Sequence, residues 1–172
     1  MKILIGFAVI VLTMHAHATQ IAFRDLTNLV SDADHVLVGT VTRVDMVDGK
    51  GNQVTKETAR TGPGSVNMLC LHVSVATNGV IASTAGKVPG EITIPLWQMW
   101  HDTLDNRKKE VEGKTFIFLL KGPDFQAVYS GLFMREMAER LEIEKLLKDK
   151  KPLNHTPDGI CQPADGLPKP SM

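Results

Sequence analysis

The clearest strand pattern in the chain lies over positions 66–76, where apolar residues occupy every second position from Leu69 to Val75. Successive side chains of a β-strand point to opposite faces, so this alternation predicts a strand with one face toward a core. The core-facing positions are Leu69, Leu71, Val73 and Val75, and the opposite face carries Met68, Cys70, His72 and Ser74.

Four further segments have strand character, at residues 35–44, 91–96, 115–120 and 125–129. Gly39, inside the first of them, predicts a bulge or a sharp bend. Pro95 predicts an edge position for the second, because proline donates no ladder hydrogen bond. The third is apolar at nearly every position, which predicts a central strand buried on both faces.

Helical spacing occurs at the two ends of the domain. Phe23, Leu26 and Val30 follow one another at intervals of three and four residues, which predicts a short helix over residues 19–34. Residues 134–149 combine spaced apolar positions with Arg, Glu and Lys, and they predict a second helix that packs on the domain.

The stretches between these elements predict loops. Residues 45–65 and 97–113 are long polar connections, and Asn78-Gly79 is typical of a turn. The charged run from Arg107 to Glu110 predicts a solvated loop tip. Residues 151–172 contain five prolines, which predicts an extended tail.

These elements predict a mainly β fold with some helix, formed as a single domain over residues 19–150. About five short strands, one leading helix and one trailing helix favour a small antiparallel barrel. A strongly bent first strand, as Gly39 predicts, fits such a barrel.

The first 18 residues have the three parts of a secretory signal peptide. Lys2 supplies a positive start, residues 3–14 are almost all apolar, and Ala16-His17-Ala18 is a small-x-small cleavage site. The alternative is an uncleaved anchor, but the apolar run is shorter than the roughly 20 residues that span a membrane. We therefore expect an exported protein, periplasmic or secreted, whose mature chain starts at Thr19.

The charge of the mature chain argues against some partners. The whole chain is formally neutral and the signal peptide holds one charge, that of Lys2, so the remaining 154 residues carry a formal charge of −1. Neutral charge disfavours a nucleic-acid partner bound through bulk electrostatics. No segment after the signal peptide has the apolar length of a membrane span.

Two cysteines, Cys70 and Cys161, are present in the mature chain. In an oxidising compartment such a pair is more often bridged than free, which predicts a disulfide that pins the tail to the domain. The alternative is two unrelated cysteines, one in a strand and one on a loose tail.

Three short motifs carry a resemblance to a known class of exported domains. They are LTNLVSDADHVLVGTVTRVD at 26–45, LCLHVSVATNGV at 69–80 and GKTFIFLL at 113–120. Together they resemble the OB-fold barrel of netrin-like and metalloproteinase-inhibitor-like domains and their bacterial exported relatives, over residues 22–133. The resemblance implies an OB barrel, a fold that hosts protein, oligosaccharide and oligonucleotide binding alike.

The chain departs from this class at its mature start. The inhibitors of the class begin with a cysteine whose free amine chelates the zinc of the protease. Here the mature start is Thr19-Gln20, and the next cysteine is Cys70. Inhibition by that mechanism is therefore not implied.

The densest group of candidate binding residues is Trp97, Met99, Trp100 and His101. Two tryptophans beside a strand can form a stacking platform or a protein-binding hot spot. The alternative is that they close one end of the barrel as core residues.

Catalytic and metal motifs are absent from the sequence. The four histidines of the mature chain form no HxH or HxxxH pair, and no G-x-S-x-G motif occurs. We therefore expect no cofactor or metal and a non-enzymatic exported domain that binds a protein or a cell-envelope component. The alternative is a small exported hydrolase or a metal-binding carrier that uses His72 and His101.

Overall fold

The computed structural model describes residues 24–96 and 101–150. The predicted signal peptide, Trp97, Met99, Trp100, Cys161 and the proline-rich tail lie outside the described residues.

The domain is built on one antiparallel sheet of six strands, which confirms the prediction of a mainly β fold. The strand order is β3-β2-β1-β4-β5, and β6 also pairs with β4. The sheet is not closed, although β3 and β5, at the two ends of this order, approach within 8 Å between Cα atoms. The strands are β1 His35–Val47, β2 Met68–Ser83, β3 Glu91–Leu96, β4 Thr115–Lys121, β5 Gln126–Ala127 and β6 Met134–Arg135.

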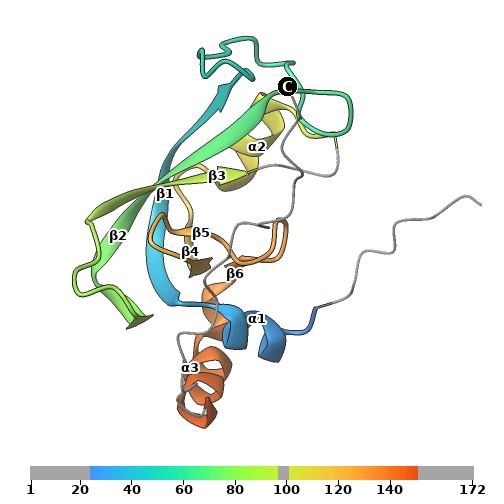
Figure 1. Cartoon of the computed structure of the whole chain (residues 1–172). Helices are drawn as coiled ribbons and strands as arrows, with labels where there is room; N and C mark the ends of the chain where they lie inside the picture. Colours follow the sequence, from blue (N-terminus) through green and yellow to red (C-terminus); the bar gives the residue numbers. More distant parts are fainter. Residues whose placement is uncertain (1–23, 97–100, 151–172) are drawn as a thin grey trace, which may run out of the picture.

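Within the described residues, three α-helices and one 3-10 turn flank this sheet. Helices α1 and α3 lie side by side at one end, near the start of β1, and α2 lies near the other end (Figure 1). None of the described helices is long and apolar enough to cross a membrane. The helical elements are α1 Leu26–Asp32, α2 Leu104–Val111, η1 Met137–Glu139 and α3 Arg140–Asp149.

Helix α2 corrects the prediction of a solvated loop tip at Arg107 to Glu110. Thr103 caps its start, since its side-chain oxygen accepts a hydrogen bond from the Asn106 amide. Leu104 and Val111, two turns apart, are both buried in the core. These are the only two apolar residues of the eight-residue helix. The polar and charged residues between them give no helical apolar pattern, so the sequence did not predict the helix.

Three other predicted boundaries change. The leading helix begins at Leu26, and Asp25 caps it by accepting a hydrogen bond from the Asn28 amide. The predicted helix over 134–149 is helical only from the 3-10 turn onward, because β6 pairs with β4 through Met134 and Arg135. The predicted strand over 125–129 shortens to β5.

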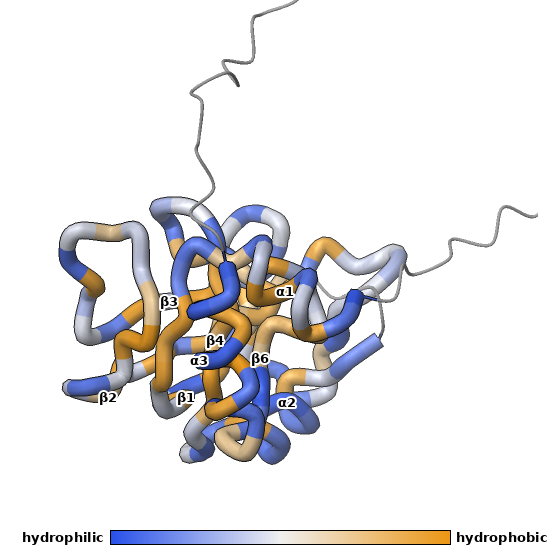
Figure 2. Tube along the Cα trace, turned by 90° about the horizontal axis from the view of Figure 1, so that it is seen from below, coloured by the Kyte–Doolittle hydropathy of each residue, from blue (hydrophilic) through white to orange (hydrophobic). Residues whose placement is uncertain are grey.

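The sheet has a hydrophobic core on each side. In Figure 2 apolar residues gather toward the interior of the domain and polar residues toward its periphery. The larger core lies on the inner face of β1–β4 and includes Leu104 and Val111 of α2. The smaller core packs α1 and α3 on the outer face of β1 and β4. β4 contributes side chains to both cores, for example Phe118 to the larger and Ile117 to the smaller. The prediction of a central strand buried on both faces over residues 115–120 is therefore confirmed.

The edge position of residues 91–96 is also confirmed, since β3 ends the strand order. The Val75 amide donates to the Gly90 carbonyl, and hydrogen-bonded pairs alternate along an antiparallel ladder. Ile92 and Ile94 therefore bond β2, whereas Pro95 turns its donor-free backbone nitrogen away from the ladder.

Two glycines, one on each strand, allow a close approach of the backbones in the long β1–β2 pair. Leu37 pairs with Val80, but Gly39 pairs with Val75, so β2 carries three extra residues between these pairs. A Cβ atom on Gly79 would lie 2.3 Å from the Val38 carbonyl oxygen, and one on Gly39 2.5 Å from Cγ1 of Val73. The irregularity predicted at Gly39 is confirmed as a register shift between Leu37 and Gly39. Asn78-Gly79 lies in a bulge within the continuous strand β2, so the turn predicted there is wrong.

Gly79→Ala is expected to lower the free energy of unfolding by about 1–3 kcal/mol, because the added methyl group collides with backbone oxygen atoms that cannot rotate away. Urea unfolding followed by circular dichroism measures this change. Gly86→Ala is the matched control, since no atom lies within 4 Å of its added methyl, and its effect should stay within about 0.5 kcal/mol. Equal effects of the two substitutions would contradict the close-contact account.

Candidate functional site

The outer face of the sheet is covered at one end and open at the other. Val36 and Val38 at the start of β1 lie under α1 and α3, in the smaller core. Further along the same face come Thr40, whose hydroxyl bonds that of Thr115 at 2.8 Å, and then charged residues. Polar side chains therefore begin where the helical cover ends.

A second β-bulge places the charged residues. Val41 pairs with Val73, and the next pair is Arg43 with His72, so Thr42 is the extra residue on β1. The Thr42 hydroxyl donates a 3.2 Å hydrogen bond to the carbonyl of His72. Through this bulge Val41 stays in the core, while Arg43 lies opposite His72 on the outer face.

Five side chains from three strands form the candidate site, which we call the Asp45–His72 cluster. Register places Arg43, His72 and Thr93 in one cross-strand row, and Asp45 pairs with Cys70 in the next row. The members are Arg43, Asp45, Cys70, His72 and Thr93.

Asp45 is the centre of the cluster. Its Oδ2 atom lies 2.9 Å from Nε2 of His72 and 3.0 Å from a guanidinium nitrogen of Arg43. The Asp45 and His72 side chains are 19% and 27% exposed, whereas that of Arg43 is 60% exposed. The Asp45 carboxylate is thus partly buried and ion-paired, whereas the Arg43 side chain that pairs with it is largely exposed to solvent.

The hydrogen bonds of His72 call for a proton on its Nε2 atom. Nε2 faces the Asp45 carboxylate, which can only accept, and Nδ1 lies 3.2 Å from the Thr93 hydroxyl oxygen. A neutral ring satisfies both contacts when Nε2–H donates to Asp45 and the Thr93 hydroxyl donates to Nδ1. The Arg43 guanidinium also lies 3.1 Å from Nε2 and shares the same carboxylate.

Cys70 lies beside this network, partly buried between Asp45 of β1 and Pro95 of β3. Burial and then the negative charge of Asp45 raise the pKa of its thiol. The side chain is therefore a protonated thiol at neutral pH, unlike the low-pKa cysteines that serve as nucleophiles. Within the described residues Cys70 forms no disulfide, and Cys161 lies outside them.

His101, the one described member of the predicted tryptophan group, lies in a different network. Its Nδ1 is 3.2 Å from the carbonyl oxygen of Thr61, and the neighbouring Asp102 pairs with Arg107 at 2.8 Å. Among the residues that the structure describes, His72 and His101 share no hydrogen-bonding partner. Across residues 24–96 and 101–150, no group of three or more His, Cys, Asp or Glu side chains is placed to hold a metal ion.

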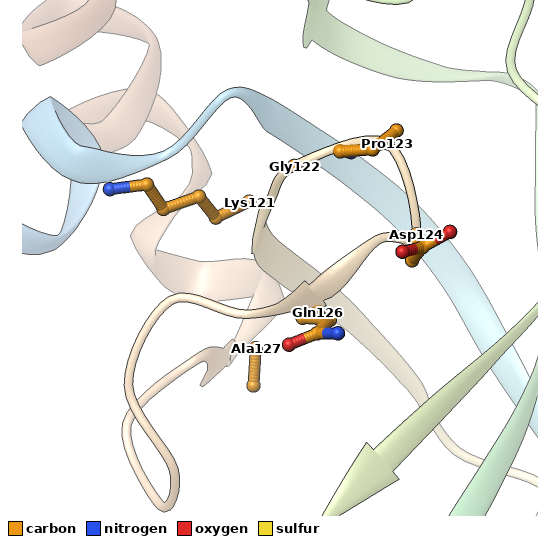
Figure 3. A pocket seen from close by; sticks show the side chains of 6 residues that line it. All are labelled: Lys121, Gly122, Pro123, Asp124, Gln126 and Ala127. Carbon is orange, nitrogen blue, oxygen red and sulfur yellow. The ribbon is translucent and has the colours of Figure 1, made fainter. Parts of the chain in front are cut away.

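A shallow pocket of about 300 Å³ lies at the turn between β4 and β5 (Figure 3). The side chains that line it diverge, since Lys121 extends toward α1 and away from Asp124 and Gln126. Under this turn the His35 ring is buried, bonded to Ser83 and Gly122. This pocket lacks the converging polar groups of a ligand site.

Sequence reasoning considered His72 but missed Arg43, Asp45 and Thr93. The alternation over 66–76 places His72 on the polar face, and similar alternation places Thr93 on the outer face of β3. The pairing of Arg43 with His72 could not be predicted from the sequence, because the bulge at Thr42 shifts the register by one residue between the two halves of β1. Comparison of the chain with known protein families and with curated proteins finds no match.

Asp45→Asn is expected to speed alkylation of Cys70 by iodoacetamide at pH 8. Loss of the negative charge lowers the raised pKa of the thiol, so a larger fraction is thiolate at that pH. The rate is measured by mass spectrometry in a Cys161→Ser background, where Cys70 is the sole cysteine. Asp105→Asn, which removes a carboxylate from α2, is the control, and an unchanged rate in both would show that Asp45 does not act on the thiol.

Proposed function

We propose that this chain is an exported, non-enzymatic binding domain whose partner is a protein or a cell-envelope component. Residues 1–18 direct export, and the partner is bound on the outer face of β1, β2 and β3, at the Asp45–His72 cluster. Bulk attraction to nucleic acid plays no part, in keeping with the near-neutral charge of the mature chain.

The proposed scaffold is a partly open OB-like barrel. Three features support it: the strand order β3-β2-β1-β4-β5, the close approach of β3 and β5, and helix α2 between β3 and β4. The inward-facing side chains of β1 to β4 share one core with Phe125 and Phe133, which follow β4. OB folds bind their ligands chiefly on the face of the second and third strands, the strands that carry His72 and Thr93 here.

The observation that carries the proposal is the preorganised polar cluster on an otherwise regular sheet. Arg43 and His72 are held by the half-sheltered Asp45, while the guanidinium remains largely in solvent. Donors fixed in this way lose little conformational entropy when a ligand binds, so they favour recognition. The bulge at Thr42 places Arg43 beside His72, and β-bulges that redirect a side chain in this way are common next to functional sites.

The double variant Arg43→Ala, His72→Gln is expected to weaken partner capture by about tenfold or more, the loss of one good charged contact. The mature protein is immobilised and exposed to the exported fraction of its own organism, and bound material is identified by mass spectrometry. Glutamine keeps a donor for Asp45, which guards against misfolding, and circular dichroism checks the fold.

The matched control is Lys109→Ala, Arg140→Gln, which breaks two exposed ion pairs on α2 and α3. A partner that wild type and control retain, and the cluster variant loses, supports the proposal. Equal capture by all three proteins places the binding surface elsewhere. Trp97→Ala with Trp100→Ala, in the same assay, tests the sequence-based prediction for the two tryptophans.

A second function, hydrolysis, is favoured by one observation. Thr93, His72 and Asp45 form a chain of hydroxyl, imidazole and carboxylate through contacts of 3.2 and 2.9 Å. That order of groups activates a hydroxyl in hydrolases. Against this function, the Arg43 guanidinium lies 3.1 Å from Nε2 and pairs with the same Asp45 carboxylate, so the carboxylate does not serve the His72 ring alone.

Wild type and Thr93→Val are expected to hydrolyse p-nitrophenyl acetate at the same rate, because the binding proposal assigns no nucleophile to Thr93. Valine keeps the shape of threonine and removes its hydroxyl. Colorimetric rates, together with a search for phosphonate-labelled Thr93 by mass spectrometry, decide the matter. A rate that the substitution abolishes would replace the binding proposal by the hydrolase.

A further inference from the structure

The register of the sheet arranges the outer-face side chains of β1, β2 and β3 in cross-strand rows. Along β2 the rows follow one another every two residues, about 6.6 Å apart in a regular strand. The row on one side of the Asp45–His72 cluster is polar, with two hydroxyl groups and a carboxylate. The rows are Thr40–Ser74–Glu91, Arg43–His72–Thr93, Asp45–Cys70–Pro95 and Val47–Met68.

On the other side of the cluster the face becomes apolar. The register of Val47 with Met68, continued beyond β1, sets Gly49 opposite Val66, and a Cβ atom on Gly49 would lie 3.0 Å from the Cβ atom of Val66. Gly49 has no side chain to cover Val66, which is 74% exposed. The partly or largely exposed residues of this part of the face form what we call the apolar strip: Val47, Val66, Met68, Cys70 and Pro95.

Arg43 lies where the polar rows meet the apolar strip, and most of its donors are unused. A guanidinium has five N–H donors, and among the described residues only its Nη2 nitrogen faces other side chains, those of Asp45 and His72. Arg43 is the one Lys or Arg of these rows, and the carboxylate of Glu91 lies on β3, two strand spacings or about 10 Å away from β1. The complement of Arg43 is therefore a negatively charged acceptor placed over β1.

We propose that the partner is a protein that lays an extended acidic segment on this face, with a carboxylate on Arg43 and an apolar side chain on the apolar strip. The inference rests on the binding function proposed above and selects a protein over an envelope glycan. Arginine beside an apolar anchor is typical of protein-binding hot spots. The hydroxyl groups of a glycan would instead lose water against the apolar strip without gaining a hydrogen bond.

The spacing of the rows also predicts the spacing within the segment. Along a regular strand the Val47 row lies about 13 Å from the Arg43 row, and the row of Val66 about 20 Å. An extended segment advances by the same amount per residue, so its acidic and apolar residues are expected four to six positions apart, counted from the strand positions 43, 47 and 49.

Two dyes test the chemistry of the face. Anilinonaphthalene sulfonate has apolar rings and one negative charge, whereas phenylnaphthylamine has the same rings and no charge. The mature protein is titrated with each dye, and the dye fluorescence gives the dissociation constant. Val66→Ser is expected to weaken the binding of both dyes by about fivefold or more, and Arg43→Ala that of the charged dye alone by a similar factor.

The matched control for the dyes is Leu141→Ser, which removes an apolar side chain that is 81% exposed on α3. It should leave both dissociation constants unchanged, and circular dichroism checks the fold of each variant. The proposal is overturned if wild type binds neither dye, if Leu141→Ser weakens binding and Val66→Ser does not, or if Arg43→Ala leaves the affinity for the charged dye unchanged.

Photocrosslinking in the mature protein tests the nature of the occupant. The photoreactive residue p-benzoylphenylalanine takes the place of Val66 in one form and of Val80, an exposed valine near the end of β2, in the other. Each form is irradiated with the exported fraction and digested. A partner peptide attached at position 66, and lost when Arg43→Ala is added, is the expected result. Adducts that contain no peptide identify a glycan, and adducts at position 80 alone identify another surface, so either result contradicts the proposal.

The capture assay separates this inference from the binding function on which it rests. A partner that requires the Asp45–His72 cluster but forms no adduct at position 66 would refute the extended segment and leave the binding function intact. The absence of any captured partner would remove the binding function, and this inference with it.

Discussion

The structure depends on one constraint, that β1 must serve two environments along its length. Its first half is buried on both faces, between the larger core and the helices α1 and α3, and its second half is buried on one face only. A regular strand keeps one alternation throughout. Three register shifts adjust the pairing of β1 with β2: a one-residue shift between Val36 and Leu37, a first bulge beside Gly39 and a second bulge at Thr42. Of the inward positions of β1 only His35 is polar, and its ring nitrogens bond Ser83 and Gly122. The fold, the open face and the candidate site all follow from this arrangement.

The first bulge requires a close approach of two backbones. Gly79 lies against the Val38 carbonyl and Gly39 against Val73, at distances that no Cβ atom tolerates. Three additional residues of β2 fit into the space that these glycines leave, and the long β2 strand can then reach the α1–α3 end of the molecule. Glycine here acts through the space it leaves open, because neither residue has a positive φ.

The second bulge links packing to chemistry. It keeps Val41 and Val44 in the core and brings Arg43 opposite His72, where both share the carboxylate of Asp45. The ion pairs are partly exposed, so their contribution to stability is small, about 0–1 kcal/mol each. Their consequence is positional, since the three side chains hold one another on an open sheet face. The same face continues from the helices to Cys70, which pairs with Asp45 across the β1–β2 ladder.

The sequence alone determined the parts of this protein that depend on local pattern. Alternation predicted β2 and its core face, uniform apolarity predicted the central β4, Pro95 predicted an edge and Gly39 predicted a bend. Tertiary structure decided two elements. Helix α2 is anchored by two apolar residues, Leu104 and Val111, that reach the larger core. Strand β2 continues across Asn78-Gly79 because Gly79 packs closely against the Val38 carbonyl of β1. It also decided the Asp45–His72 cluster. Arg43, Asp45 and Thr93 come from strands whose register is set by a bulge and by long-range pairing, and neither leaves a trace in the spacing of residues along the chain.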